Sequence, residues 1–391
     1  GQATVEFALG CTVGALGTVY SLSATGDDVS ATLAPMIAGT WSLATALSLL
    51  DSKQVAALAG NAVAFTTGQL AALTTDQLDG MSATQFGAIS AISVPGLTTE
   101  QFSSLTSDQI NGMSAAAVAK IETEDLVSLA SDQFGGLSAS VIQSLNKSQL
   151  AALSTDQLSQ LDATQLGAIN ALNVPAFTTE QFSSLTSDQV NGFGSDSVAR
   201  IETEDLVKLS TDAIVGLSDA VVSSLTRTQV AALTTAQVQA LTASQMATLS
   251  AAQVNAVSTA KLAAASAEQI AAIATATLSK VDTAHINALT TDQVAAFSQS
   301  QVKSLSAAQV TALSDAQVGS LSASQVSVLS AAQVAAIESG DIASLTTDAI
   351  AAMSTTQAKA LTTGQLHSLD SDQVMSLGTA QIGVLSSAQV N

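Results

Sequence analysis

The chain has 391 residues, a formal net charge of −21, ten Lys and Arg residues and a single cysteine. So few basic residues cannot neutralise a phosphate backbone, which argues against nucleic-acid binding, and one cysteine excludes an intrachain disulfide. Because 47% of the residues are apolar and only 10% are charged, the low-complexity composition favours a folded repeat array over disorder.

Residues 1–50 differ in kind from the rest of the chain. Glu6 is the only charged residue between positions 3 and 22, and a second apolar stretch covers residues 29–50. Each stretch is long enough to span a bilayer. We predict an apolar N-terminal helix or a helical hairpin that serves for assembly or anchoring. The thiol of Cys11 has no nearby base and is expected to be buried and inert.

The opening Gly1-Gln-Ala-Thr-Val-Glu-Phe-Ala-Leu9 resembles the N-terminal processing region of type IV pilins, in particular the Tad/Flp and TadE-like class. The resemblance implies that a leader is removed and that the apolar helix moves from the membrane into a filament. It also implies that Glu6 partners the terminal amine of a neighbouring subunit, and we assign Glu6 and Phe7 to assembly. Two departures are that Gly1 is still present and that those pilins are usually much shorter.

An eight-residue repeat begins at Phe65, after an irregular lead-in of residues 51–64. It continues to residue 391 without insertion or deletion, as forty full octads and a seven-residue remainder. Leu289-Thr-Thr-Asp-Gln-Val-Ala-Ala296 is a typical octad. The first and sixth positions are apolar in all 41 units, the second is usually Ser or Thr, and the fifth is Gln in 27.

The spacing within the octad decides between helix and strand. The two apolar columns are five and three residues apart, and odd spacings would place them on opposite faces of a strand. In a helix, the sixth residue and the next first residue are i and i+3 and share a face. Ser/Thr-x-x-Gln is also the capping-box pattern. We therefore predict an all-α solenoid in which each octad is one capped helix of about six or seven residues, held by its neighbours. A β-solenoid with corners at the Ser/Thr positions is the alternative.

Two further comparisons bear on the repeat. The segment from Gln69 returns from Gln149, eighty residues or ten octads later, and Pro95 and Pro175 occupy equivalent seventh positions where a helix would end or turn. Leu-Thr-x-x-Gln-Val-x-Ala also resembles the first helix of transcription-activator-like effector repeats. That likeness supports a helix but implies no DNA binding, because the second helix and the base-reading loop are absent.

Residues capable of catalysis or metal binding are few. His285 occupies the Gln position of its octad and His367 a seventh position, and we interpret both as surface or capping residues. Two acidic groups, interpreted as solvated helix starts rather than calcium ligands, are Glu122 with Glu124 and Asp125, and Asp370 with Asp372. We predict no catalytic, cofactor or metal site, and no enzyme activity.

The sequence points to a structural role. The array ends within an octad at Val390, still in full apolar pattern, whereas solenoids normally need a polar terminal unit. We predict that another copy covers this end, which gives a fibre when the contact does not close. The expected function is a pilus-like, self-assembling filament subunit, extracellular or at the cell surface after leader removal, with a membrane stage before assembly. The alternative is a membrane-anchored surface stalk or an adhesin that acts as a binding module.

Overall fold

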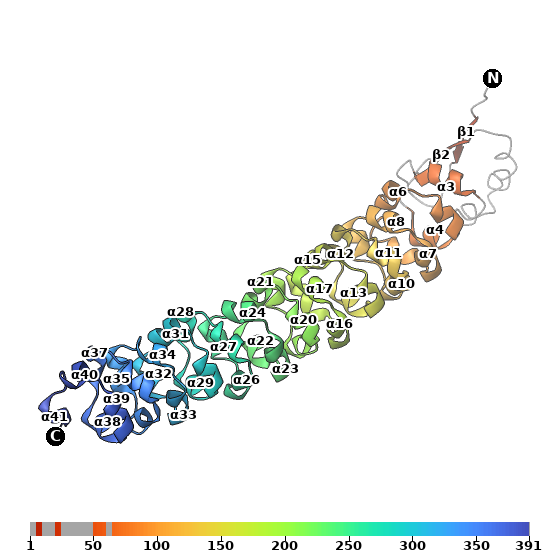
Figure 1. Ribbon diagram of the computed structural model, residues 1–391. Helices are drawn as coiled ribbons and strands as arrows, with labels where there is room; N and C mark the ends of the chain where they lie inside the picture. Colours follow the sequence, from red (N-terminus) through yellow and green to blue (C-terminus); the bar gives the residue numbers. More distant parts are fainter. Residues whose placement is uncertain (1–4, 10–19, 25–49, 60–64, 391) are drawn as a thin grey trace. The chain divides into compact units, whose positions relative to one another are not determined.

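The computed structural model describes residues 5–9, 20–24, 50–59 and 65–390. The chain divides into two compact units, Gly1–Leu185 and Thr186–Asn391. Each unit is described by itself, and Figure 1 labels the elements along the chain. No helix in the described ranges has both the length and the apolar character needed to cross a membrane.

The N-terminal segment contains two strands, β1 (Val5–Leu9) and β2 (Tyr20–Ala24), which pair antiparallel with Glu6 opposite Ser23 and Phe7 opposite Leu22. The helix predicted over these ten residues is therefore wrong. The physical reason is visible in β2, where apolar residues alternate with serine in the two-residue period of a strand. The remaining residues of 1–49, including Cys11, lie outside the described part.

The helices follow one another at octad spacing. The first unit contains α3 (Ser52–Ala59), α4 (Thr67–Ala71), α5 (Thr75–Asp79), α6 (Ala83–Gly87), η1 (Val94–Gly96), α7 (Thr99–Ser104), α8 (Ser107–Gly112), α9 (Ala115–Val118), α10 (Thr123–Ser128), α11 (Ser131–Gly135), α12 (Ala139–Ser144), α13 (Lys147–Ala152), α14 (Thr155–Ser159), α15 (Ala163–Gly167), η2 (Ala171–Ala176) and α16 (Thr179–Ser184). The two 3-10 helices, η1 and η2, contain the two predicted turn prolines.

The second unit continues the same pattern. It contains α17 (Ser187–Gly192), α18 (Ser195–Val198), α19 (Thr203–Leu206), α20 (Thr211–Val215), α21 (Asp219–Ser224), α22 (Arg227–Ala232), α23 (Thr235–Ala240), α24 (Ala243–Thr248), α25 (Ala251–Val254), α26 (Thr259–Ala263), α27 (Ala267–Ala271), α28 (Thr275–Leu278), α29 (Thr283–Asn287), α30 (Thr291–Ala295), α31 (Gln299–Ser304), α32 (Ala307–Thr311), α33 (Asp315–Gly319), α34 (Ala323–Val326), α35 (Ala331–Ala336), η3 (Asp341–Ser344), α36 (Thr347–Ala351), α37 (Thr355–Ala360), α38 (Thr363–Ser368), α39 (Ser371–Ser376), α40 (Thr379–Ile382) and α41 (Ser387–Val390).

The predicted solenoid of very short capped helices is confirmed, and over residues 65–390 the β-solenoid alternative is wrong. In α24, the hydroxyl of Thr242 accepts from the Gln245 amide at 3.1 Å, and Gln245 Oε1 accepts from the Thr242 amide at 2.7 Å. This is the predicted capping box. Helices such as α24 have six residues and α25 has four. The six residues of α24 match the predicted length, and α24 ends where the next first-position residue, Leu249, takes an extended backbone (φ −65°, ψ 134°). The four-residue α25 is shorter than predicted.

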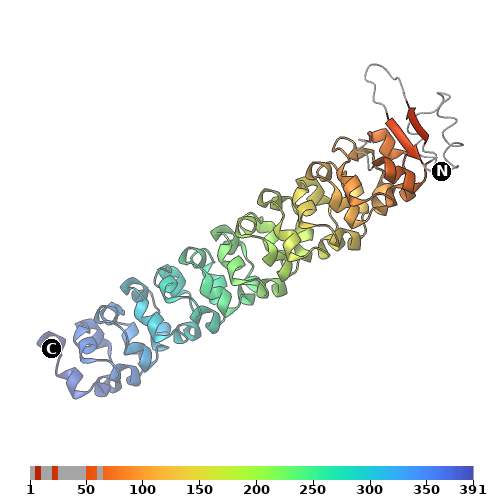
Figure 2. The same cartoon turned by 90° about the horizontal axis from the view of Figure 1, so that it is seen from above.

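The core is built from the two apolar columns. Val238, Leu241 and Met246 are at most 4% exposed, because sixth- and first-position side chains share one face of each octad. Helices three octads apart pack side by side, as do α21, α24, α27 and α30 in turn. Figure 2 shows the helices of each unit following one another in successive turns.

The hydrogen bonds define the length of one turn. Gln245 Nε2 donates to the carbonyls of Ile214 and Leu217, which lie 31 and 28 residues earlier. The 28 residues are three octads plus the four positions that separate the first from the fifth place of an octad, and helices that pack side by side are also three octads apart, so one turn of the solenoid contains about three octads. The sequence pattern alone did not reveal this number, because every octad looks alike.

Small residues at the eighth position of the octad allow neighbouring turns to approach closely. A Cβ atom on Gly112 would collide with the backbone of Ala83, and one on Gly96 would collide with the backbone of Thr67. Only glycine fits at these two places without a shift of the neighbouring turn.

Candidate functional site: the glutamine clamps and the terminal turn

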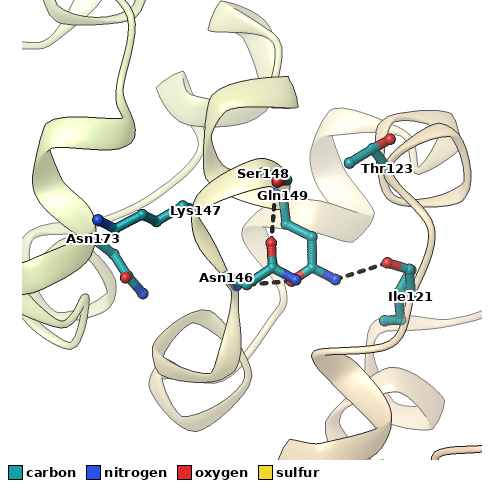
Figure 3. Close-up of a pocket in the computed structure, with 7 residues that line it drawn as sticks. All are labelled: Ile121, Thr123, Asn146, Lys147, Ser148, Gln149 and Asn173. Carbon is teal, nitrogen blue, oxygen red and sulfur yellow. Dashed lines mark hydrogen bonds between the residues drawn. The ribbon is translucent and has the colours of Figure 1, made fainter.

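We define a glutamine clamp as a fifth-position Gln side chain that joins its own helix start to the end of a helix in the previous turn. In Figure 3, Gln149 Oε1 accepts from the Asn146 amide at 2.8 Å, and Nε2 donates to the Ile121 carbonyl at 2.8 Å. Nε2 also donates to the Val118 carbonyl at 2.8 Å, and Gln149 is 1% exposed. The clamp therefore provides a partner for the Asn146 amide and the Ile121 carbonyl, and a second donor for the Val118 carbonyl, which already accepts from the Ile121 amide.

The surface between turns contains two open hollows of about 570 and 530 Å³. The first is drawn in Figure 3, and its lining residues are Ile121, Thr123, Asn146, Lys147, Ser148, Gln149 and Asn173. The asparagine side-chain amides that line this hollow already form hydrogen bonds, because Asn146 Nδ2 donates to the Ala119 carbonyl and Asn173 Nδ2 donates to the Leu145 carbonyl. The hollow is a gap between turns that offers no convergent set of free catalytic groups.

Fourteen octads lack Gln at the fifth position. Their residues are Ser93, Ala117, Asp125, Val141, Asn173, Ser197, Asp205, Ala213, Val221, Lys261, Thr277, His285, Asp341 and Ala349. Four of them keep a bond to a carbonyl 28 or 30 residues earlier, namely Asn173, Lys261, Thr277 and His285. The inter-turn bond is thus the more general function of this position, and Gln is its usual donor.

In three of the octads without a fifth-position Gln, an asparagine side chain from an earlier octad provides the acceptor for the amide of the capping residue. Asn191 Nδ2 donates to the Gly216 carbonyl at 3.0 Å, and its Oδ1 accepts from the Ser218 amide at 2.7 Å. Ser218 caps the helix of the octad whose fifth-position residue is Val221, so Asn191 supplies the acceptor that the missing Gln would have supplied. Asn111 and Asn255 make the same pair of bonds.

The two histidines differ from one another. The prediction that His285 is a surface or capping residue is wrong, because it is 9% exposed and makes no cap bond. Its Nε2 lies 2.8 Å from the Val257 carbonyl, in the role of the clamp donor, and its Nδ1 is buried without a partner among the described residues. His367 is exposed, as predicted.

Two aspartates occupy the clamp position in buried surroundings. The interpretation of Asp125 as a solvated helix start is wrong, because Asp125 and Asp205 are each 3% exposed. Burial raises the pKa of Asp205 from 3.8 to about 6, with Glu202 and Glu204 adding to the shift. Burial also raises the pKa of Asp125, although the Thr99 hydroxyl donates to its Oδ1 at 2.8 Å and opposes the shift.

The other acidic residues lie where the sequence placed them. Glu122, Glu124, Asp370 and Asp372 are exposed at helix starts, and Asp370 caps α39 by accepting from the Gln373 amide at 2.8 Å. At Asp341, burial and the nearby Glu338 and Asp315 raise the pKa of the carboxyl group. Within the described ranges, no three His, Cys, Asp or Glu side chains gather closely enough to hold a metal ion.

The terminal turn, residues 362–390, presents apolar side chains that interior turns bury. The sixth-position residues Val374, Ile382 and Val390 are 43%, 48% and 66% exposed. The equivalent Val334 and Ile350 are 0% exposed. In the described part of the chain, the last clamp is made by Gln389, whose Nε2 donates to the Leu361 carbonyl. The carbonyls of sixth- and first-position residues after Leu361 therefore accept no hydrogen bond from a clamp within the described residues.

The predicted assembly residues lie at two ends of the chain. Val390 lies at the end of α41 and is exposed on the terminal turn. Glu6 and Phe7 belong to β1, and the structure describes their strand pairing but not their side chains. Sequence reasoning missed the clamp. The available signal was the recurrence of Gln in 27 octads, because a capping box accepts Glu as well as Gln.

Comparison with known proteins finds similarity to a repeat family. The family described as ALTTAQ repeat matches residues 198–235 and 334–371. Both matched segments lie in the second unit and consist of octads of the kind described above. No curated protein matches the chain.

Proposed function

We propose that the chain is a structural subunit of a self-assembling extracellular filament and that it is not an enzyme. The observation that carries the proposal is that successive turns cover one another through one repeated interface, in which clamps such as that of Gln245 reach the Ile214 and Leu217 carbonyls. An interface that repeats along one chain can also form between copies of that chain.

A second copy of the same chain is the partner that fits this interface. Each interior turn covers its predecessor with apolar side chains and with Gln Nε2 groups that reach the sixth- and first-position carbonyls. The terminal turn offers the same apolar residues and the same carbonyls, so a partner with octads would continue an interface that the chain already uses many times. A head-to-tail contact that does not close extends into a fibre.

The N-terminal segment and the charge agree with this proposal. The pilin-like start around Glu6 and Phe7 supports export, leader removal and a membrane stage before assembly. The net charge of −21 would keep a large polymer soluble by self-repulsion.

Sedimentation velocity over a range of concentrations, followed by negative-stain microscopy, tests the proposal. The double variant Ile382→Glu with Val390→Glu places two charges on the terminal turn, and desolvating them would oppose association. The matched control is Val215→Glu, because Val215 is 49% exposed but lies in α20, within the array. We expect the unmodified chain and the control to assemble with increasing concentration and the double variant to remain monomeric.

Two results would count against the filament. A chain that stays monomeric at all concentrations in detergent-free buffer has no self-association. A chain that stays dispersed only with detergent would favour the membrane-anchored stalk instead.

A further inference from the structure

Charged side chains in the second unit are sorted by the side of the solenoid on which they lie. Helices three octads apart stack on one another, so every third octad belongs to the same column. We define the acidic column as residues 217–224, 241–248, 265–272, 289–296, 313–320 and 337–344. We define the basic column as residues 225–232, 249–256, 273–280, 297–304 and 321–328. Each octad of the basic column directly follows one of the acidic column, and both columns lie wholly in the second unit.

The acidic column carries six carboxyl groups and no Lys or Arg. They belong to Asp219, Glu268, Asp292, Asp315, Glu338 and Asp341. All except the half-buried Asp341 are exposed, and the stacking of α21, α24, α27, α30, α33 and η3 places them in successive turns. Burial is the main cause of the raised pKa of Asp341, and the charges of Glu338 and Asp315 add to it. The carboxylates of neighbouring turns therefore repel one another without a cation of their own column to offset the repulsion.

The basic column has the opposite content. It carries Arg227, Lys280 and Lys303 and no Asp or Glu. All three side chains are exposed, and none forms an ion pair with a described residue. In this column α22 packs against α25 and α28 against α31, and the Thr277 hydroxyl, which donates to the Leu249 carbonyl at 3.2 Å, links the two pairs. A chain with a net charge of −21 thus keeps one positive side over residues 225–328.

We propose that the basic column of one copy binds the acidic column of a second copy, so that copies associate side by side through their second units. The two rows of charge have a matching repeat, because Lys280 and Lys303 are one turn apart, as are Asp292 and Asp315. A contact between two acidic columns would be repulsive, and complementary rows fix both the partner and the register of the contact. A second copy always carries the acidic row that fits.

This lateral contact goes beyond the proposed function and does not depend on it. The head-to-tail contact lengthens a filament, whereas the columns would join copies along their sides. A pair of single chains is enough to form it, so the test can fail while the filament proposal stands.

Carbodiimide cross-linking of the full chain tests the contact, because this reagent couples a lysine amine to a carboxylate beside it. An equal mixture of unlabelled and isotopically labelled chain distinguishes links between copies from links within one copy. We expect mixed-isotope peptides that join Lys280 or Lys303 to carboxylates of the acidic column. Their yield should fall about tenfold or more between roughly 50 mM and roughly 500 mM salt, because salt screens exposed charges. Absence of these peptides at both salt concentrations would overturn the proposal and leave the basic column to a different anionic partner.

Two triple variants separate loss of the contact from loss of folding. One carries Arg227→Glu, Lys280→Glu and Lys303→Glu, and the other carries Glu268→Lys, Asp292→Lys and Asp315→Lys. Each variant alone has two columns of like charge and is expected to lose the links between copies. A mixture of the two variants restores opposite charges and should restore links between the two columns. If the mixture gives no such links although each variant keeps the circular dichroism of the unmodified chain, the columns do not bind one another.

A third variant controls for net charge. The changes Asp76→Lys, Asp212→Lys and Asp282→Lys alter the net charge as much as the three lysine substitutions in the acidic column, but these exposed residues lie outside both columns. We expect this variant to keep the mixed-isotope peptides of the unmodified chain. An equal loss in this control would show that overall charge, and not the two columns, governs the association.

Discussion

Glutamine suits the fifth position because this place needs both an acceptor and donors at the end of a long side chain. Oε1 accepts from the amide of the residue that caps the helix, and Nε2 reaches carbonyls 28 and 31 residues earlier, as at Gln157. Glutamate would keep the acceptor and lose the donors, and lysine would do the opposite. The clamp thus explains why one amide side chain recurs along the whole array.

A substitution of the clamp by its isosteric acid tests this requirement. Gln157→Glu places a carboxylate against the Leu126 and Leu129 carbonyls, and we expect it to lower the free energy of unfolding at pH 7 by about 2–4 kcal/mol. The control is Gln160→Glu on the exposed C-cap of the same helix, expected to change stability by less than about 0.5 kcal/mol. Urea unfolding followed by circular dichroism measures both, and equal effects would contradict the clamp.

Asp205 provides a pH-dependent prediction. Its pKa is raised from 3.8 to about 6 in the folded chain, so folding favours the protonated carboxyl group. The favourable contribution is complete below pH 3.8 and is lost as the pH rises through about 6. Asp205→Asn should therefore stabilise the second unit by up to about 3 kcal/mol at pH 8 and have little effect at pH 3.5.

The measurement is the urea midpoint of the Asp205→Asn variant at several pH values. Asp212→Asn is the control, because Asp212 is exposed in the first turn of α20 and should change stability by less than about 0.5 kcal/mol. A gain from Asp205→Asn that is the same at pH 8 and pH 3.5 would mean that ionisation of Asp205 is not the cause.

At the scale of the element, helices of four to six residues such as α25 and α24 are too short to be stable alone in water. Their stability comes from the capping box, from the two apolar columns and from the turns above and below. Close approach between turns is therefore a condition of folding, and the eighth-position glycines at tight places should be sensitive to added volume.

Gly112→Ala tests this sensitivity. The added methyl group would collide with the backbone of Ala83, and we expect a loss of about 1–3 kcal/mol from the resulting strain. Gly68→Ala is the matched control in the same unit, because a Cβ at Gly68 meets no atom within 4 Å, and alanine is the better helix former. Thermal unfolding of both variants measures the effect. An unchanged Tm of the Gly112→Ala variant would show that the turns are not tightly packed at this place.

The sequence predicted the contents of each octad but not the relation between octads. Capping by residues such as Thr242 and burial of Val238 and Leu241 follow from spacing within eight residues. The 28-residue clamp could not be predicted, because identical octads do not identify which one lies above which. The burial of Asp125 and His285 was missed for the same reason, since their partners lie in another turn.

The N-terminal strands were missed for a different reason. The length and apolarity of residues 3–22 predict a helix, whereas the alternation of apolar residues with serine in Tyr20–Ala24 is typical of a strand. The observed pairing of β1 with β2 shows that, for the two strands, the local two-residue period was the better guide.

At the scale of the whole molecule, the central claim is that another copy covers the terminal turn. Hydrogen exchange of residues 366–390, measured over a range of protein concentrations, tests this claim most directly, with residues 290–320 as the internal reference. If copies associate at this end, protection of residues 366–390 rises with concentration while the reference stays constant. Protection of residues 366–390 that stays the same at every concentration would contradict the account.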